Sequence, residues 1–321
     1  MLDHGKMSKI AIIILNWNGK NDTLACLRSL ERISCSNFET LVVDNGSVDD
    51  SVAAIRAHFP QVTLIATGEN LGFAEGNNVG IREALARGAE RILLLNNDTV
   101  VDPDLLHHFE EAIQQDPRIG ILGAKAYLFD APHLLDHFGG LWNPGRAQFD
   151  LVGYRAIEDN ISWEQSKHLD YACGCALFVK REVFEAIGLL EPKFFLIWEE
   201  ADFCFRARRA GFFVMSAPQA KILHKVSASF KSKPHSTYFW WRNRLLWIER
   251  NCSRLQKLKI FLNPLLPEIL NLYKLKLLKS IQFYLFPSKQ KQARRLEELT
   301  RYSAALRGVK DYCLRRFGNR F

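Results

Sequence analysis

Apolar and polar residues follow one another in blocks along the first hundred positions. Four apolar runs, at 9–15, 38–43, 61–66 and 91–95, each end in a cluster of Asn, Asp or Gly, and a helical pattern follows. Such runs are typical of strands buried on both faces of a parallel sheet. Strand, polar tip and helix in repetition predict βαβ units. We therefore expect an α/β fold with a mostly parallel central sheet flanked by helices.

The remainder of the chain is less regular. Residues 105–116 predict a helix, whereas residues 120–160 are rich in Gly, Pro and aromatic residues and predict short strands and loops. Four further elements are expected: a strand at 170–180, a helix from about Glu200, and two short strands at 212–214 and 221–223.

The polar tips of the four strands contain Asn16, Asp44, Asn70 and Asp98. Each alone is a common turn former. Because the carboxyl ends of parallel strands meet at one edge of a sheet, four in succession indicate a nucleotide crevice. No GxGxxG follows the first run, and the chain contains no GxxxxGK[ST]. A dinucleotide or P-loop site is therefore not supported, and a nucleoside diphosphate held through a metal remains.

Asp98 is the strongest metal-ligand candidate. One carboxylate in a short polar segment suits a hard divalent cation, which takes oxygen ligands and keeps positions open. The alternative is that Asp98 caps the helix near Pro103, but Asp102 directly precedes this proline and suits the cap better. His224, at the end of a predicted strand, is a second candidate ligand, although a lone His is more often an ordinary surface or core residue.

The second set of acids is Glu199 and Glu200. In the first turn of a helix both carboxylates would be favoured by the helix dipole, which is a purely structural explanation. The functional alternative is a general base, partly desolvated beside Trp198. In the preceding predicted strand, Gly174 would let a ligand approach the backbone closely. Cys173 and Cys175 could bind metal, but small buried residues are the better interpretation.

Charge divides the chain unevenly. The 321 residues, 48% of them hydrophobic, carry a net charge of +8, yet residues 221–321 hold 23 Lys and Arg against 5 Asp and Glu. The first 220 residues are therefore acidic, and the basic tail is expected to meet an anionic surface. Seven cysteines without a CxxC pair favour a reducing compartment.

From His235 onward, aromatic residues alternate with arginines and lysines, as in a helix that lies in a membrane interface. Pro264, Pro267 and the lysines argue against a spanning helix, and no window of 18 apolar residues lacks charge. The alternative is an amphipathic helix packed on the catalytic domain. No nucleic-acid recognition motif is present. Residues 10–15 are too brief for a signal peptide.

The chain resembles the inverting family 2 glycosyltransferases of GT-A fold, especially the bacterial rhamnosyltransferase-like branch. This resemblance covers about residues 8–230. The matching stretches are ILNWNG (14–19), LVVDNGSVDDS (41–51), ENLGFAEGNNVGI (69–81), LLLNNDTVVDPD (93–104), GCALFVKREVFEAIGLLEPKFFLIWEEADFCFRARRAGF (174–212) and ILHKVSAS (222–229).

The resemblance implies roles for individual residues. Asp98 matches the last, metal-binding acid of the DxD motif, with Asn96 in place of its first acid, and His224 matches a histidine that joins the metal and the diphosphate. Glu200 matches the catalytic base, next to Glu199, and the acceptor would meet Gly174 and Trp198. The donor would contact Asn16, Asp44, Asn70, Gly72, Phe73, Asn77, Asn96 and Asn97.

The implied protein has a Rossmann-like GT-A catalytic domain at residues 8–234 and a helical, basic, membrane-associating region at 235–321. It would use Mg²⁺ or Mn²⁺ to move a sugar, with dTDP-rhamnose favoured and UDP-sugars possible, to a lipid-linked or growing surface glycan. Its place would be the cytoplasmic face of the inner membrane. A nucleotidyltransferase and an inactive sugar-binding scaffold remain as alternatives.

Overall fold

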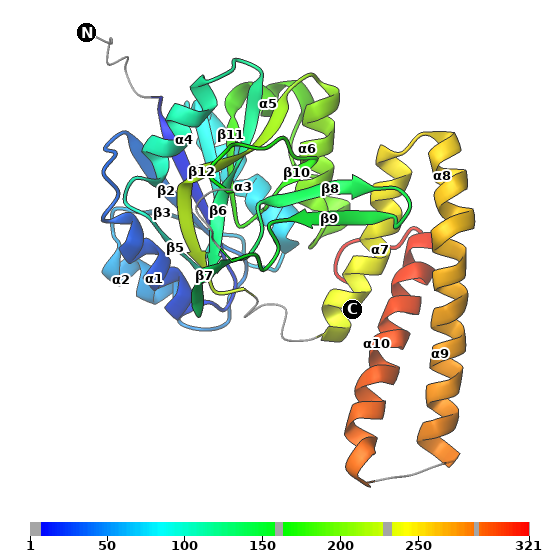
Figure 1. The fold of residues 1–321 in the computed structure, drawn as a ribbon. Helices are drawn as coiled ribbons and strands as arrows, with labels where there is room; N and C mark the ends of the chain where they lie inside the picture. Colours follow the sequence, from blue (N-terminus) through cyan, green and yellow to red (C-terminus); the bar gives the residue numbers. More distant parts are fainter. Residues whose placement is uncertain (1–7, 158–162, 227–232, 286–288, 321) are drawn as a thin grey trace. The chain divides into compact units, whose positions relative to one another are not determined.

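The computed structural model describes residues 8–157, 163–226, 233–285 and 289–320 (Figure 1). The chain forms two compact units. The first unit comprises Met1–Leu141, Leu151–Pro192 and Glu200–Val226. The second comprises Trp142–Asp150, Lys193–Glu199 and Ser227–Phe321. Residues 227–229, at the end of the motif that begins at 222, lie outside the described residues.

The first unit is an α/β structure, and its elements follow the predicted strand–helix rhythm as far as α4. These elements are β1 (Ile10–Asn16), α1 (Lys20–Leu30), β2 (Phe38–Asp44), α2 (Ser51–His58), β3 (Thr63–Ala66), α3 (Gly72–Ala86), β4 (Arg91–Asn96), β5 (Thr99–Val101), α4 (Leu105–Gln114), β6 (Ile119–Leu128), β7 (Ala131–Leu135), β10 (Tyr171–Ala172), β11 (Ala176–Lys180), α5 (Arg181–Ile187), the 3₁₀ helix η1 (Pro192–Phe194), α6 (Glu199–Arg209) and β12 (Phe213–His224). Strands β8 (Gly139–Asn143) and β9 (Gln148–Val152) pair with each other, and β8 also pairs with β10.

The central sheet has the strand order β3-β2-β1-β4-β11-β6-β12-β5, with β7 paired to β6. Strands β3, β2, β1 and β4 are parallel, which confirms the predicted βαβ half. Strand β11 is antiparallel to both of its neighbours, β4 and β6, and β5 is antiparallel to β12. The α/β fold is thus as predicted, but the sheet is mixed rather than mostly parallel.

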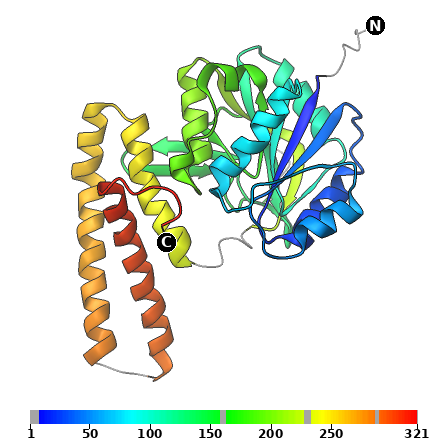
Figure 2. The ribbon, with the colours of Figure 1, turned by 180° about the vertical axis from the view of Figure 1, so that it is seen from behind.

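The two faces of the sheet use alternate residues of each strand, because side chains of a strand point to opposite faces in turn. Ile12 of β1 packs in a core cluster with Leu27 of α1 and Phe109 of α4. Helix α3 covers the other face, which is seen in Figure 2. There a Cβ on Gly80 would lie 2.6 Å from Ile13 Cγ2, so the glycine permits close helix–sheet packing.

Strand β6, which lies between β11 and β12 in the sheet, was not predicted as a long strand. All ten residues of β6 are buried, although residues 120–160 were expected to form only short strands and loops. Gly120, Gly123 and Lys125 interrupt the apolar pattern there, which explains the error. A Cβ on Gly123 would lie 2.8 Å from the Ala172 Cβ, and the buried Lys125 ammonium lies 3.3 Å from a Glu164 carboxylate oxygen.

Two smaller predictions also change. The strand expected at 170–180 is divided at residues 173–175 into β10 and β11, which belong to different sheets. The two short strands expected at 212–214 and 221–223 are one irregular strand, β12. The N-cap residue of α4 is Asp104 and not Asp102. The Asp102 side chain instead accepts a hydrogen bond from the backbone N–H of Asp104. Asp98 caps no helix.

The second unit is mainly helical. Its elements are α7 (Lys233–Asn251), α8 (Arg254–Ile260), the π-helical turn η2 (Phe261–Leu265), α9 (Leu266–Leu285) and α10 (Lys289–Cys313). Helix α10 packs against both α7 and α9, as both ribbon views show. Among the described residues, no helix combines the length and the apolar composition needed to cross a bilayer.

The aromatic and basic residues of α7 lie inside the second unit. Trp247, Arg242 and Arg244 are fully buried. The Arg242 guanidinium donates to the Phe194 carbonyl, and that of Arg244 donates to the Ala147 carbonyl and to Glu268. The expectation that this part of the tail lies in a membrane interface is therefore wrong. Its arginines hydrogen-bond to backbone carbonyls inside the unit.

Candidate functional site

The carboxyl ends of β1, β2 and β4 lie side by side at one edge of the sheet. In the strand register Asn16 pairs with Asp44, and Leu15 pairs with Asn96. Residues that are far apart in the sequence are thereby brought together at the predicted edge. The parallel topology alone has this consequence, because adjacent parallel strands end on the same side.

Asn16 is fully buried and its side chain is engaged by the protein itself. Its amide donates to Asp44 Oδ1 at 2.7 Å and to Ser47 Oγ at 3.0 Å. Its carbonyl oxygen accepts from Thr23 Oγ1 at 2.7 Å. An amide has two N–H donors, so no donor is left over for a ligand. Asn16 therefore supports Asp44, whose second oxygen accepts from the Ser47 backbone N–H.

The loop before α3 is held by Asn45, which the sequence analysis did not single out. The Asn45 amide donates to Asn70 Oδ1 and to the Gly72 carbonyl, both at 3.1 Å, and its oxygen accepts from the Leu71 N–H. Gly72 has a φ of +82°, a region that glycine adopts without strain. Asn45 thus fixes the shape of this loop. The signal was available, because Asn45 directly follows Asp44 at the strand end.

Phe73 and Asn77 lie on the first two turns of α3. The Asn77 side chain is buried and donates to the Phe73 carbonyl at 2.8 Å, while Phe73 is partly exposed. At the β4 end, Asn97 donates to Thr23 Oγ1 at 3.0 Å, and a Cβ on Gly19 would lie 2.4 Å from its amide nitrogen. The Asn96 backbone N–H donates to the Cys175 carbonyl at 2.9 Å.

Asp98 and His224 meet, although 126 positions of sequence separate them. His224 Nε2 lies 3.3 Å from Asp98 Oδ1. This oxygen is buried, and apart from the contact with His224 it has no hydrogen-bond partner among the described residues. A buried carboxylate oxygen with so few partners is unusual and requires an explanation. A carboxylate oxygen and an imidazole nitrogen that face each other fit a divalent cation.

Asp136, which the sequence analysis missed, orients His224. Its Oδ2 lies 2.9 Å from His224 Nδ1, and Nε2 is thereby directed at Asp98. Burial alone would lower the pKa of His224, but the hydrogen bonds to Asp136 and Asp98 outweigh it and raise the pKa to about 10. Histidines that bind metal commonly donate their other N–H to a carboxylate in this way.

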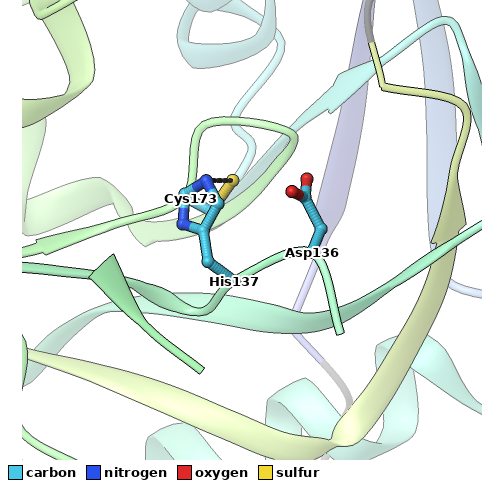
Figure 3. A group of neighbouring side chains, drawn as sticks. All are labelled: Asp136, His137 and Cys173. Atoms are coloured by element: carbon cyan, nitrogen blue, oxygen red, sulfur yellow. Dashed lines mark hydrogen bonds between the residues drawn. The ribbon is translucent and has the colours of Figure 1, made fainter. Parts of the chain in front are cut away.

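His137 continues the network toward β10 (Figure 3). Its Nε2 lies 3.6 Å from Cys173 Sγ, and this sulfur lies 3.3 Å from Cys175 Sγ. Burial would lower the pKa of His137, but the Cys173 sulfur, Asp136 and Glu200 raise it to about 9. The hydrogen bond with Cys175 and the charge of His137 lower the pKa of Cys173. No sequence motif marked His137, and only folding brings it to Cys173.

Glu200 lies beside Gly174, the residue between the two cysteines. A Cβ on Gly174 would lie 3.4 Å from Glu200 Cγ. Burial raises the pKa of Glu200 to about 7 and the Cys173 sulfur adds to the rise, while backbone N–H groups and His137 oppose it. One oxygen of Glu200 is buried without a hydrogen-bond partner in the described part of the chain. This carboxyl can therefore exchange a proton near neutral pH.

Glu199 and Trp198 belong to the second unit. Glu199 is buried at the start of α6. Trp198 is buried among aromatic rings, with its ring centroid 5.4 Å from that of Phe149 and 5.8 Å from that of Trp247. It contributes to an aromatic core in that unit. Glu200 and Gly174 belong to the first unit, together with Asp98, Asp136 and His224.

Asp136, His137 and Cys173 also form a group that could hold a metal ion. One ligand atom of each lies within 4.8 Å of the others. A thiolate and an imidazole suit a soft metal such as Zn²⁺ better than Mg²⁺ or Mn²⁺. Asp136 Oδ2 is already engaged with His224. For a hard cation, the pair Asp98 and His224 is the better fit.

Residues 11–188 match the model of glycosyl transferase family 2. A low-salt glycan biosynthesis hexosyltransferase, Agl10, of Haloferax volcanii is 27% identical over 251 residues, covering 75% of each chain. An N-acetylglucosaminyl-diphospho-decaprenol L-rhamnosyltransferase of Mycobacterium tuberculosis is 24% identical, covering 72% of this chain and 85% of the relative.

Among solved structures, the mannosyltransferase PcManGT of Pyrobaculum calidifontis, in complex with GDP-Man and Mn²⁺, superposes with a TM-score of 0.59 at 14% identity. The alignment covers 96% of this chain and 88% of that chain. Because the identity is low, this likeness concerns the fold, which is that of the GT-A glycosyltransferases. The family model, which matches more than half of the chain, shows that this protein belongs to family 2 of the glycosyltransferases.

Proposed function

We propose that this glycosyltransferase is metal-dependent and inverting, and that it transfers rhamnose from dTDP-rhamnose to a lipid-linked or growing surface glycan. The observation that carries the proposal is a continuous set of contacts within the first unit. It runs from Asp98 through His224 and Asp136 to His137, Cys173 and the Gly174–Glu200 contact. A metal-ligand pair and a carboxyl that titrates near neutral pH thus share one network.

On the donor side, Asp44 and the Asn70–Phe73 loop receive the nucleoside, and Asn16 and Asn45 hold these groups in place. This assignment rests on the strand register and on the hydrogen bonds that engage both amides. Asn77 supports the loop from α3, because its side chain donates to the Phe73 carbonyl. Asn96 and Asn97, next to Asp98, face the diphosphate. We assign the catalytic role to residues 8–234, which contain all of these side chains.

Asp98 and His224 hold the divalent cation. The support is the buried Asp98 oxygen, which lies 3.3 Å from His224 Nε2 and has no other hydrogen-bond partner among the described residues. A Mg²⁺ or Mn²⁺ ion bound there would neutralise the charge of the departing nucleoside diphosphate. Asp136 keeps His224 oriented for this role. Mn²⁺ is also the ion bound with GDP-Man in the archaeal mannosyltransferase of similar fold.

Glu200 is the general base. It removes the proton from an acceptor hydroxyl while the hydroxyl oxygen forms a bond to the anomeric carbon, and the bond from that carbon to the diphosphate oxygen breaks. The displacement inverts the anomeric centre. Gly174 supports this role because its backbone lies close to the Glu200 side chain, where a Cβ would be 3.4 Å from Glu200 Cγ.

The rhamnosyl donor is proposed from the named activity of the mycobacterial relative, whose name also gives a diphospho-decaprenol acceptor. A lipid-linked acceptor would bring the enzyme to the cytoplasmic face of the inner membrane. The basic region at 235–321 is suited to such a surface, since it carries most of the chain's excess positive charge.

The deciding experiment incubates the purified chain with dTDP-rhamnose and Mn²⁺, with and without EDTA, and measures the products. We expect release of dTDP that EDTA abolishes and that Asp98→Asn lowers by at least tenfold. Release of pyrophosphate would instead identify a nucleotidyltransferase. No product from dTDP-rhamnose, UDP-glucose or GDP-mannose would identify a scaffold. With an acceptor present, retention of the donor's anomeric configuration in the product would contradict the inverting mechanism.

A further inference from the structure

The second unit contains a pocket of about 780 Å³ that is lined by basic residues. It lies between α9 and α10, with the C-terminal segment closing one side. The charged residues in its lining are Lys276, Arg307, Lys310, Arg316, Arg320 and a single acid, Asp311. None of these residues belongs to the site around Glu200.

Most of this positive charge has no counter-ion. Asp311 accepts a hydrogen bond from the Tyr238 hydroxyl at 2.9 Å and lies 3.9 Å from Arg307 Nε, so its charge is already engaged. For Lys276, Lys310, Arg316 and Arg320, the described part of the chain contains no carboxylate within 4.0 Å. Cations that gather without counter-ions repel one another, and a bound anion would relieve this repulsion.

An exposed apolar stripe runs along α9 beside the pocket. It consists of Leu270, Tyr273, Leu277, Ile281 and Tyr284, which are spaced by three and four residues and therefore share one face of the helix. Their exposed fractions range from 41% at Ile281 to 76% at Tyr284. Tyr273 belongs both to this stripe and to the pocket lining. The stripe and the pocket thus form one continuous surface, the α9 surface.

We propose that the α9 surface binds a membrane of anionic phospholipid. The phosphate of a lipid head group occupies the basic pocket, and the leucine, isoleucine and tyrosine side chains of the stripe enter the boundary between head groups and acyl chains. Charge decides the partner. Residues 254–285 carry six Lys and Arg and one acid, Glu268, which is bonded to Arg244. A second copy of this chain would present the same positive charge and be repelled.

This inference deepens the proposed function, since it places the lipid-linked acceptor's membrane at a defined surface. The test is co-sedimentation of the full chain with phosphatidylcholine vesicles, with and without about one third phosphatidylglycerol. We expect binding only to the anionic vesicles and weaker binding at high salt. The variant Lys276→Gln/Lys310→Gln/Arg316→Gln should lose roughly 100-fold in partitioning, because each basic residue near an anionic surface strengthens binding about fivefold.

The matched control is Arg28→Gln/Arg32→Gln/Arg56→Gln, which removes the same charge from exposed positions of the first unit and should bind as the parent does. Leu277→Gln/Tyr284→Gln tests the stripe separately and should also weaken binding. Thermal unfolding checks that each variant is folded. Inorganic pyrophosphate, offered without vesicles, tests whether the pocket selects a soluble anion instead.

Three results would overturn the inference: undiminished vesicle binding by the pocket variant, tight pyrophosphate binding without vesicle binding, or self-association that Leu277→Gln abolishes. Release of dTDP from dTDP-rhamnose in the absence of vesicles should be the same in the pocket variant and the parent. If the parent releases no dTDP but still binds anionic vesicles through the pocket, the proposed function fails and the membrane surface stands.

Discussion

Glu200 combines two properties that oppose each other in a folded protein. Its carboxyl lies beside Gly174, where we propose proton transfer, and burial raises its pKa to about 7. A carboxyl whose pKa is raised in the folded state destabilises the fold when ionised, because the unfolded chain releases the proton more readily. The stability that the protonated form gives below pH 4.5 is lost as the pH rises toward 7.

We therefore expect Glu200→Gln to lower kcat by about 100-fold or more, because it removes the general base. The same substitution should raise the free energy of unfolding at pH 8, since no buried charge then forms. Steady-state kinetics and urea denaturation measure the two effects, and Glu31→Gln at an exposed position is the control. A variant that is slower and also less stable at pH 8 would contradict this account.

The pH dependence follows from the same pKa. A general base must be deprotonated, so kcat/KM of the parent enzyme should fall about tenfold per pH unit below 7 and level off above it. The residual activity of Glu200→Gln should lack this transition. A parent profile that is flat between pH 5 and 8 would assign the proton transfer to another group.

Asp136 supplies a further test at this scale. Loss of a carboxylate that orients a metal-binding histidine commonly costs 10- to 100-fold in metal affinity. Asp136→Asn should weaken Mn²⁺ binding by about this factor, as measured by calorimetry without substrate, whereas Asp130→Asn at an exposed position should not. Equal Mn²⁺ affinity in Asp136→Asn and the parent would show that His224 needs no such support.

Two glycines of α3 show how an element is fitted to the sheet. A Cβ on Gly80 would lie 2.6 Å from Ile13 Cγ2 and 3.1 Å from Val43 Cγ2, in fully buried strands. A Cβ on Gly76 would lie 2.6 Å from Leu15 Cδ1, at the end of a longer side chain. The γ-carbons of Ile and Val are fixed by their χ1 preference, whereas a leucine can rotate.

Gly80→Ala should therefore destabilise the protein by about 1 to 2 kcal/mol, after the gain in helix propensity is subtracted. Gly76→Ala should cost less. Urea denaturation of the two variants makes the comparison within one helix. The opposite order of stability would mean that α3 moves away from the sheet and that side-chain rigidity is not decisive.

In the second unit, α7 holds an unusual backbone segment through Asn243. Phe195, Ile197 and Trp198 have positive φ values of 63°, 70° and 80°. Residues other than glycine rarely adopt this region of backbone conformation. The Asn243 amide donates to the carbonyls of Phe194, Leu196 and Ile197 at 2.7 to 2.8 Å. One buried side chain thus stabilises a strained loop.

Asn243→Ala should lower the free energy of unfolding by about 2 to 4 kcal/mol, because the part-buried carbonyls of Leu196 and Ile197 lose a donor and the buried Phe194 carbonyl loses one of its donors. Gln292→Ala, at an exposed position of α10, should leave it nearly unchanged. Thermal and urea denaturation provide the measurement. A loss below about 0.5 kcal/mol would show that water replaces the amide at these carbonyls.

For the whole molecule, the second unit is not a simple C-terminal extension. Its aromatic core joins Trp142 and Phe149 of the β8–β9 hairpin tip to Trp198 and to Trp247 of α7. The first three residues precede the predicted catalytic boundary at 234, whereas the fourth follows it. Removal of residues 235–321 would therefore expose large aromatic surfaces that a folded chain buries.

A chain truncated after residue 234 should aggregate or lose the near-ultraviolet circular dichroism of its buried tryptophans. Gel filtration and circular dichroism of the truncated and full chains provide the comparison. A monomeric truncated chain with an unchanged near-ultraviolet spectrum would show that the two hairpin aromatics and Trp198 find other partners. A separate, dispensable tail would then be the correct description.

The local pattern of the sequence determined the parallel half of the sheet. Period and turn residues between 9 and 95 fix strands and helices locally, and parallel strands that follow one another place their polar ends at one edge without further information. For the same reason the strand ends that carry Asn16, Asp44 and Asp98 were expected at one edge. The register confirms that these strand ends are adjacent, because Asn16 pairs with Asp44 and Leu15 with Asn96. The resemblance to family 2 added the family and the residues near its motifs.

Only the tertiary structure decided what depends on contacts between distant segments. Strand β6 is not recognisable from the sequence because glycines and a lysine interrupt its apolar pattern. The reason for these residues is seen only in their contacts, since Gly123 packs against Ala172 and Lys125 pairs with Glu164. Asp136 and His137 could not be recognised as site residues from the sequence. Only the folded chain brings Asp136 to His224 and His137 to Cys173. In sequence, the arginines of α7 look like those of a helix that lies on a membrane. In the structure, Arg242 and Arg244 donate hydrogen bonds to backbone carbonyls. A side chain's partner is set by the packing of the whole chain, and local periodicity does not contain it.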